Sequence, residues 1–262
     1  MAPAFGRSIL FLAPHPDDEV VACHAAIGRA KATGARVSAI FLTHGCVSRQ
    51  TMWPWARGGY EAAVARRRAE AENVLANLGV EAAGWSDRAA RDLWRHLDAA
   101  EAEIRAAVSR FGIDQIWAPA FEGGNADHDA ANAIAARLAA EGMSVLEFAE
   151  YNLAGGRVNS HVFPTLYGRE ETLALTPAEQ AAKRRALALY ASEGLNLSYV
   201  KLERETFRPL PAHDYGAPPH AGKLWYARFQ WAPIRHPGVD FTQPEAVARA
   251  LADYRRDLGV RR

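Results

Sequence analysis

Short apolar runs alternate with alanine-rich segments of helical periodicity along the first half of the chain, and this alternation restricts the fold most. Strand-like runs fall at 8–13, 36–42, 80–85, 112–119 and 144–151, and helical patterns fall at 20–33, 60–78, 92–110 and 128–142. Strands joined by helices run parallel, because each helix returns the chain to the same edge of the sheet. The sequence therefore predicts an α/β fold, a doubly wound and mostly parallel sheet with helices on both faces and strand order 3-2-1-4-5.

The chain beyond residue 151 has a looser pattern. We expect one clear helix there, at 177–190, among proline-containing loops and short strands. With 262 residues, 49% of them hydrophobic, the chain can bury a large core. We therefore interpret 1–262 as a single domain, in which 1–150 form the core and 151–262 form a loop-rich extension that walls a pocket.

Composition argues against several classes of protein. A formal net charge of +1 gives no reason to expect nucleic acid or an anionic membrane as a partner. Cys23 and Cys46 are too few for a disulfide framework and wrongly spaced for a zinc ribbon or a redox pair. The N-terminal apolar segment is too short for a signal peptide, and no run is long enough for a transmembrane helix, so we expect a soluble cytoplasmic protein.

One histidine and three carboxylates, His15, Asp17, Asp18 and Glu19, follow the first predicted strand directly in the sequence PHPDDE. In a sheet of the expected order, the first and fourth strands are neighbours where the order reverses, and ligands bind at that point. The loop after the fourth strand holds a second cluster of similar composition. Its members are Asp127, His128 and Asp129.

The two clusters together have the composition of a metal site. Pro16 suits the first helical position, which places His15 and Asp18 about one turn apart and facing one point, while Asp17 points elsewhere. Two imidazoles and a carboxylate fit a catalytic zinc site with an open position for water, although such a site also accepts Fe²⁺ and other divalent ions. A further carboxylate can then move the proton. The alternative is that the acidic residues only favour the positive end of a helix.

The segments PHPDDE, GGNADHDAA and RRAEAENVLANLGV resemble those of the PIG-L or LmbE-like family of zinc-dependent N-acetylglucosaminyl deacetylases, over roughly residues 8–150. The resemblance implies a Rossmann-like fold and the removal of acetyl or similar acyl groups from amino sugars. It also implies that His15, Asp18 and His128 bind Zn²⁺. Asp17 is then the general base that activates the attacking water, and later the acid that protonates the departing amine.

The sequence departs from the family pattern at Asn125, where members commonly carry a histidine that steadies the oxyanion or assists proton transfer. The Asn125 amide can donate a hydrogen bond in this catalytic position but cannot carry a proton at neutral pH. Another histidine elsewhere in the chain is an alternative source of that function. The candidates are His44, His161, His213, His220 and His236.

Three further residues receive roles from the resemblance. Asp127 is expected to orient a metal-bound imidazole, with a charge at the start of a helix as the alternative. Arg67 and Asp87 lie where members place contacts to sugar hydroxyls, although an ion pair with Glu70 explains Arg67 as well. The aromatic loop 44–61 is expected to cap the pocket, and its tryptophans to stack on a sugar, with a plain surface loop as the alternative.

The leading hypothesis is a zinc-dependent deacylase that acts on an N-acetylglucosamine-type amino sugar or its small-molecule conjugate. The alternatives are an amidase of the same fold for a larger amide and a non-catalytic zinc- or sugar-binding relative, suggested by Asn125. A nucleotide-binding protein is disfavoured, because PHPDDE replaces the glycine-rich phosphate loop and acidic groups repel a pyrophosphate. The oligomeric state is left open, with a homo-oligomer among the options.

Overall fold

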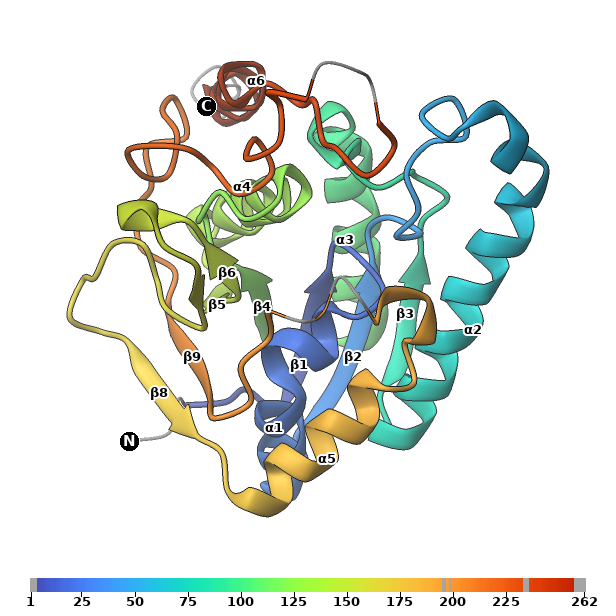
Figure 1. The fold of residues 1–262 in the computed structure, drawn as a ribbon. Coiled ribbons are helices and arrows are strands. Elements are labelled where there is room, and N and C mark those ends of the chain that lie inside the picture. Colours follow the sequence, from blue (N-terminus) through green and yellow to red (C-terminus); the bar gives the residue numbers. More distant parts are fainter. Residues whose placement is uncertain (1–3, 195–196, 198, 233–235, 257–262) are drawn as a thin grey trace.

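The computed structural model describes residues 4–194, 197, 199–232 and 236–256. Its centre is a seven-stranded sheet of order β3-β2-β1-β4-β5-β9-β8 (Figure 1). Strands β1 to β5 are parallel, β9 pairs antiparallel with β5, and β8 pairs antiparallel with β9. The strands are β1 (Ser8–Ala13), β2 (Arg36–Phe41), β3 (Glu81–Trp85), β4 (Gln115–Pro119), β5 (Ser144–Ala149), β8 (Glu171–Ala174) and β9 (Arg204–Pro209).

Helices cover both faces of this sheet, as predicted. One buried cluster joins the sheet to α3 (Leu97–Phe111), α4 (Ala126–Ala140) and α6 (Pro244–Arg256). The other joins it to α1 (Asp18–Ala32), α2 (Tyr60–Leu78) and α5 (Pro177–Leu187). The remaining elements are the strand pair β6 (Tyr151–Asn152) and β7 (Asn159–Ser160) and the 3-10 turns Pro54–Gly59, Leu93–Arg95, Ala154–Gly156 and Ala191–Glu193.

Strand β1 lies at the centre of the sheet and is buried along its whole length. Its side chains alternate between the two clusters, with Leu10 and Leu12 in one and Ile9, Phe11 and Ala13 in the other. A strand covered by helices on both faces reads as a continuous apolar run, because both of its faces must be apolar. The run at the start of the sequence is therefore explained by the double layer of helices.

The helix boundaries correct the sequence predictions in three places. The first helix begins at Asp18, so Pro16 precedes it and is not its first residue. The third predicted helix is divided, because the 3-10 turn at Leu93–Arg95 precedes α3. Helix α6 was not predicted, although Val247, Leu251 and Tyr254 give it a buried face at helical spacing.

The predicted strand order is confirmed, and it determines where a site can form. Strand β1 lies between β2 and β4, so the order reverses there, and the loops that leave β1 and β4 meet at the carboxyl ends of the strands. The loop after β1 carries PHPDDE, and the loop after β4 leads into α4 with its own cluster. Within the described residues, no helix is long and apolar enough to cross a membrane.

Candidate metal centre

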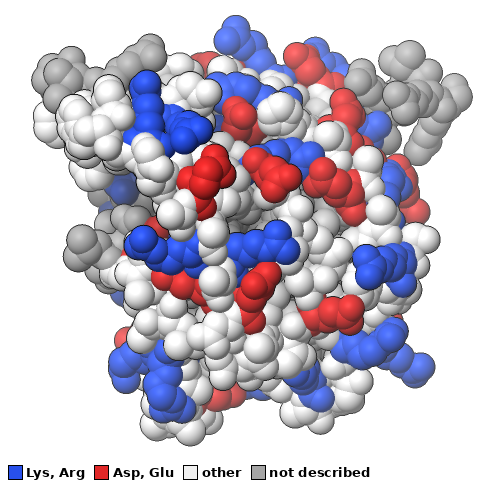
Figure 2. Space-filling model, turned by 90° about the vertical axis from the view of Figure 1, so that its right-hand side faces the viewer, with Lys and Arg blue, Asp and Glu red and all other residues white. Residues whose placement is uncertain are grey.

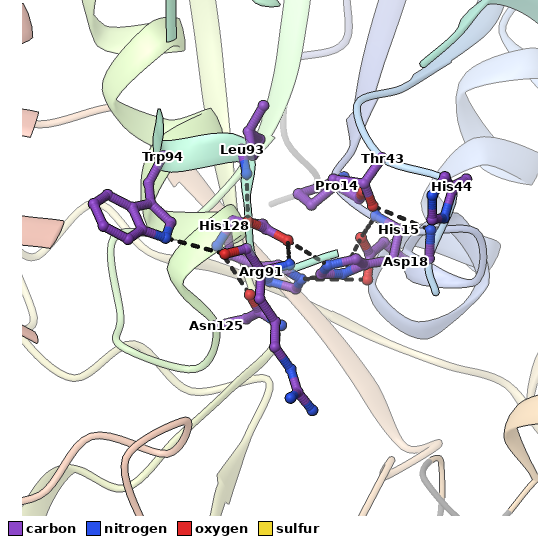
Figure 3. Close-up of polar contacts among 12 residues, drawn as sticks. Pro14, His15, Asp18, Thr43, His44, Arg91, Leu93, Trp94, Asn125 and His128 are labelled. Carbon is purple, nitrogen blue, oxygen red and sulfur yellow. Dashed lines mark hydrogen bonds and ion pairs between the residues drawn. The ribbon is translucent and has the colours of Figure 1, made fainter. Parts of the chain in front are cut away.

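The structure brings His15, Asp18 and His128 together at this point, although more than a hundred residues separate the two histidines (Figure 3). One ligand atom from each residue lies within 4.8 Å of the others. Nε2 of His128 lies 3.3 Å from Nδ1 of His15 and 3.4 Å from Oδ1 of Asp18, and Nδ1 of His15 lies 3.6 Å from Oδ2 of Asp18. Three potential ligand atoms therefore face one point.

The outer nitrogen of each imidazole faces a second carboxylate. Nε2 of His15 lies 3.0 Å from Oδ2 of Asp127, and Nδ1 of His128 lies 2.8 Å from Oε2 of Glu150. When the outer nitrogens carry the protons, both inner nitrogens present lone pairs beside the Asp18 carboxylate. Such a convergence of acceptors needs a cation between them, so the donor set fits a divalent metal ion held by two imidazoles and one carboxylate.

The electrostatics of the cluster lead to the same conclusion. Burial disfavours the charged imidazole, but hydrogen bonds to Asp127 and Asp18 outweigh it and raise the pKa of His15 to about 9. The pKa of His128 is also raised well above its usual value, against the effect of burial, by Asp18 and Glu150. Burial would raise the pKa of Asp18, yet the two histidines lower it strongly. The surrounding carboxylates thus favour positive charge at this point.

Asp127 joins His15 to the segment before α3. Its carboxylate accepts hydrogen bonds from the backbone N–H groups of Arg91 at 2.5 Å and Leu93 at 2.9 Å, in addition to its contact with His15. Arg91 has a φ of 73°, which is uncommon for a residue with a side chain. The N-cap of α4 is Asn125, and Asp127 lies in the first turn of that helix. Asp127 is therefore placed to orient the His15 ring.

Glu150 was missed by the sequence analysis. It follows β5 directly, is fully buried, and its backbone N–H donates to Oε1 of Glu122 at 2.7 Å. Burial raises the pKa of Glu150 to about 7, with Asp18 adding to the increase and His128 opposing it. The available signal was an acidic residue at the carboxyl end of the strand beside β4, where its side chain can reach the loop that carries His128.

Asp17 takes a different direction from Asp18, as predicted. Its φ of 129° lies outside the regions that residues with side chains usually adopt, and such strain persists only where the surroundings enforce it. Its Oδ2 lies 3.3 Å from Nη2 of Arg67, and its backbone N–H donates to Oε2 of Glu19 at 3.2 Å. Burial raises the pKa of Asp17 to about 7, against the lowering effect of Arg67. Asp17 thus has a pKa close to neutrality and lines the same pocket as His15 and Asp18.

A pocket of about 400 Å³ opens over this cluster. A second hollow of about 620 Å³ adjoins it and shares with it Val47, Ala90, Arg91 and Asp240. Acidic and basic side chains are mixed over the described part of the face in Figure 2, without one dominant sign. The residues that line the first pocket include His15, Asp17, Asp18, Arg67, Asn125, Tyr151, Tyr199, Trp225, Arg228 and Asp240.

Arg67 lines the pocket and is nearly fully buried. Its guanidinium donates to the Pro16 carbonyl and to Asp17, and lies 3.1 Å from Glu193. The alternative pairing with Glu70 is not the one adopted, since Glu70 accepts hydrogen bonds from Ser192. Arg67 therefore holds one oxygen of the Asp17 carboxylate.

Several other predicted residues lie away from the pocket. Asp87 is exposed and, with His44, lines a separate cavity of about 50 Å³. Trp53 and Trp55 stack on each other with ring centroids 5.1 Å apart, and Trp55 is 79% exposed; Trp53 lines the second hollow. None of the five alternative histidines is among the described residues that line the first pocket.

Asn125 does line the pocket, and it has a structural task as well. Asn125 is the N-cap of α4, and its Oδ1 accepts a hydrogen bond from the Asp127 N–H at 2.9 Å. Its amide nitrogen is the donor that can face the pocket. Tyr151 lies beside it, with its ring 5.7 Å from that of His128. A side chain at Gly124 would collide with the backbone and ring of Tyr151, so the glycine lets Tyr151 approach the site.

The fold and the cluster define a class: α/β proteins with two histidines and one aspartate at the switch point of a parallel sheet. Residues 10–139, about half of the chain, match the PIG-L family, described as GlcNAc-PI de-N-acetylase. The matched region contains all three residues of the cluster and Asp17. The chain belongs to the PIG-L family.

Similar solved structures share the fold. A deacetylase of the teicoplanin biosynthesis pathway has a TM-score of 0.62 at 19% identity, covering 79% of this chain and 99% of its own. A zinc-inhibited form of teicoplanin deacetylase has a TM-score of 0.58 at 17% identity, with the same coverage. The N,N'-diacetylchitobiose deacetylase from Pyrococcus horikoshii has a TM-score of 0.53 at 17% identity, covering 78% of this chain and 84% of its own. No curated protein sequence gave a match.

Proposed function

We propose that this protein is a zinc-dependent deacetylase that hydrolyses the acetyl amide of an N-acetylglucosamine-type amino sugar, carried on a small-molecule conjugate. One observation carries the proposal: the inner lone pairs of His15 and His128 converge with Asp18, and the carboxylate of Asp17 lines the same pocket. Membership of the PIG-L family supports it. Fe²⁺ is a second metal that such a donor set accepts.

His15, Asp18 and His128 would hold the metal. When bound, a divalent metal polarises the amide carbonyl and lowers the pKa of water in the pocket. Asp127 and Glu150 keep the two imidazoles in the tautomer that leaves their inner nitrogens unprotonated. The protein residues thus provide a fixed binding site without movement of their own.

Asp17 is the residue we assign to proton transfer. Arg67 holds its carboxylate by one oxygen, which leaves the other for the attacking water. As general base, Asp17 takes a proton from that water, and as general acid it gives the proton to the nitrogen of the breaking amide. A pKa near neutrality suits a group that must both accept and release a proton.

Asn125 and Tyr151 are the groups we assign to the oxyanion. Both line the pocket beside His128, and each can donate one hydrogen bond to the carbonyl oxygen of the amide as negative charge develops there. Neither is needed to carry a proton when Asp17 serves as both base and acid. This arrangement accounts for an asparagine in place of the usual histidine.

Arg67 keeps a role in substrate binding in this proposal, because it lines the pocket beside Asp17. Asp87 stays a prediction for substrate contact, since it lies outside the pocket lining. The adjoining hollow of about 620 Å³ can take the part of the conjugate beyond the sugar.

The decisive experiment combines metal analysis with assays of amine release from N-acetylglucosamine conjugates, for the wild type and Asp17→Asn. We expect bound zinc in both and at least about 10²-fold slower hydrolysis in the variant, the usual contribution of a general acid–base group. Bound zinc without hydrolysis of any amide on a broad panel supports the alternative that the protein is a non-catalytic zinc- or sugar-binding relative. Hydrolysis restricted to larger amides supports the amidase. Failure to bind any metal after reconstitution contradicts the site itself.

A further inference from the structure

Helix α1 is broken at Cys23, one turn after the PHPDDE segment. Cys23 has φ −136° and ψ 16°, which are not helical values, so the helix consists of a short segment before the break and a longer one after it. A break of this kind frees backbone N–H groups at the start of the second segment. Because α1 lies in the core at this point, these groups need protein partners.

Glu205 of strand β9 supplies those partners. Its Oε1 accepts from the N–H of Ala25 at 3.0 Å, and its Oε2 accepts from the N–H of Ala26 at 2.8 Å. It therefore acts as an N-cap for the second segment, but from a strand about 180 residues further along the chain. A side chain from another element thus satisfies two N–H groups that the break leaves free.

The charge of Glu205 is balanced by Lys183 of α5, whose Nζ lies 2.9 Å from Oε1. Both side chains are completely buried. A buried charge without a partner is strongly unfavourable, so each member of this pair is tolerated because the other is present. Lys183 therefore locks Glu205 in the position from which it caps α1.

The short segment before the break carries Asp18 and has only about one turn of its own, too little to hold a direction independently. It is held from both ends. Near its start, the Tyr190 hydroxyl, just after α5, donates to Glu19. At its end, the break is closed by Glu205. Residues of the extension thus contact both ends of this segment, in addition to the Arg67 contact with Asp17.

We propose that Lys183 and Glu205 form a positioning pair, which aligns the first turn of α1 so that Asp18 meets His15 and His128 at one metal ion. The pair contacts none of the three ligands and acts through the backbone of α1. This inference rests on the proposed function only in that the three residues bind a metal. It adds that metal binding also requires Lys183 and Glu205, which lie outside the site and align the first turn of α1.

The test compares Glu205→Gln with Glu179→Gln. Glutamine at 205 has one acceptor oxygen and no charge, so one N–H at the break and the Lys183 ammonium lose their partner. Glu179 of α5 pairs with Arg29 of α1 beyond the break, so Glu179→Gln also removes one ion pair of α5 but leaves the break untouched. Zinc affinity is measured by chelator competition well below the melting temperature, and Co²⁺ absorption reports coordination geometry.

We expect Glu205→Gln to weaken zinc binding about 10-fold or more, in the range typical of outer groups at metal sites, and to change the Co²⁺ spectrum. Glu179→Gln should stay within about twofold of the wild type, since it leaves the break intact. A folded Glu205→Gln with wild-type affinity and spectrum overturns the positioning pair alone. A wild type without metal affinity overturns the proposed site, and the pair with it.

Two further variants keep the test decisive if Glu205→Gln does not fold. Glu205→Asp retains the charge that Lys183 needs but shortens the reach to Ala25 and Ala26. The double variant Lys183→Met with Glu205→Gln removes both charges together. Zinc affinity reduced in Glu205→Asp, with its circular dichroism unchanged, supports positioning. Wild-type affinity in both variants contradicts it.

Discussion

The two halves of the chain contribute to the site in different ways. Within the described part of the chain, residues up to β5 supply the three potential metal ligands and Asp17, on the loop after β1 and in the first turns of α1 and α4. Residues from Glu150 onward supply the outer partner of His128, the Tyr190 contact to Glu19 and the cap on the break in α1. The potential ligands thus come from one part of the chain, while both parts contribute the contacts that position them.

A variant of α6 should lower the stability of the fold without lowering zinc affinity, which separates apolar packing from polar positioning. Leu251 is fully buried in the cluster that includes α4, so Leu251→Ala should lower the free energy of unfolding by about 3 kcal/mol, as is typical of leucine truncation in a core. Zinc affinity at 25 °C should change less than twofold, because His128 keeps its polar contacts. Chemical denaturation and chelator competition measure the two quantities. A parallel loss of affinity would mean that apolar packing also holds the site.

The two carboxylates behind the histidines allow a direct comparison of the halves. Glu150→Gln removes the charge behind His128, and Asp127→Asn removes the charge behind His15. We expect each to weaken zinc binding about 10- to 100-fold, the usual effect of such partners. Isothermal calorimetry or chelator competition provides the measurement. Wild-type affinity in Glu150→Gln would mean that the charge beside His128 does not contribute to zinc binding.

The same contrast explains what the sequence could predict. The ligands were recognisable because they follow apolar strands within a few residues, and parallel topology brings the ends of β1 and β4 together. Glu150 was marked only by its place at the end of a strand. Lys183 and Glu205 act through contacts between distant segments, which no local spacing reveals. Their neighbours in the sequence look like ordinary strand and helix residues.

The start of α1 shows a similar limit on a smaller scale. Proline usually favours the first helical position, yet α1 begins at Asp18, because Asp17 adopts a φ of 129° between Arg67 and Glu19. Tertiary contacts override the local preference at that residue. Helix α6 differs, because its sequence does have helical periodicity. It was not predicted because the surrounding region was interpreted as loops.

Tyr151 tests whether the second half also contributes to the reaction. Tyr151→Phe keeps the ring against His128 but removes the hydroxyl, so kcat should fall about 10-fold or more, while zinc content and KM change little. Steady-state kinetics on the best conjugate give the two constants. An unchanged kcat would leave Asn125 as the remaining oxyanion donor in our proposal.

The rate of hydrolysis by Asn125→His tests the other proposed oxyanion donor. A faster enzyme would mean that histidine performs this step better even in the present pocket, and a slower one would mean that the pocket has been built around asparagine. The N-cap of α4 favours the second outcome, because Asn125 Oδ1 accepts the Asp127 N–H and histidine is a weaker cap. Asp127 in turn contacts His15, so a change at the cap should also shift the His15 ring.

The smallest expected effect concerns the pair that joins α5 to α1 beyond the break. Arg29 lowers the pKa of Glu179 to about 2, from an ordinary value of 4.5. A carboxyl with a lowered pKa in the folded state stabilises the protein fully above pH 4.5 and progressively loses that effect as the pH falls towards 2. Because both side chains are partly exposed, the contribution should stay below about 1 kcal/mol. The difference in unfolding free energy between wild type and Glu179→Gln should therefore shrink from pH 6 to pH 3. A constant difference would show that the charge of Glu179 contributes nothing to the stability of the fold.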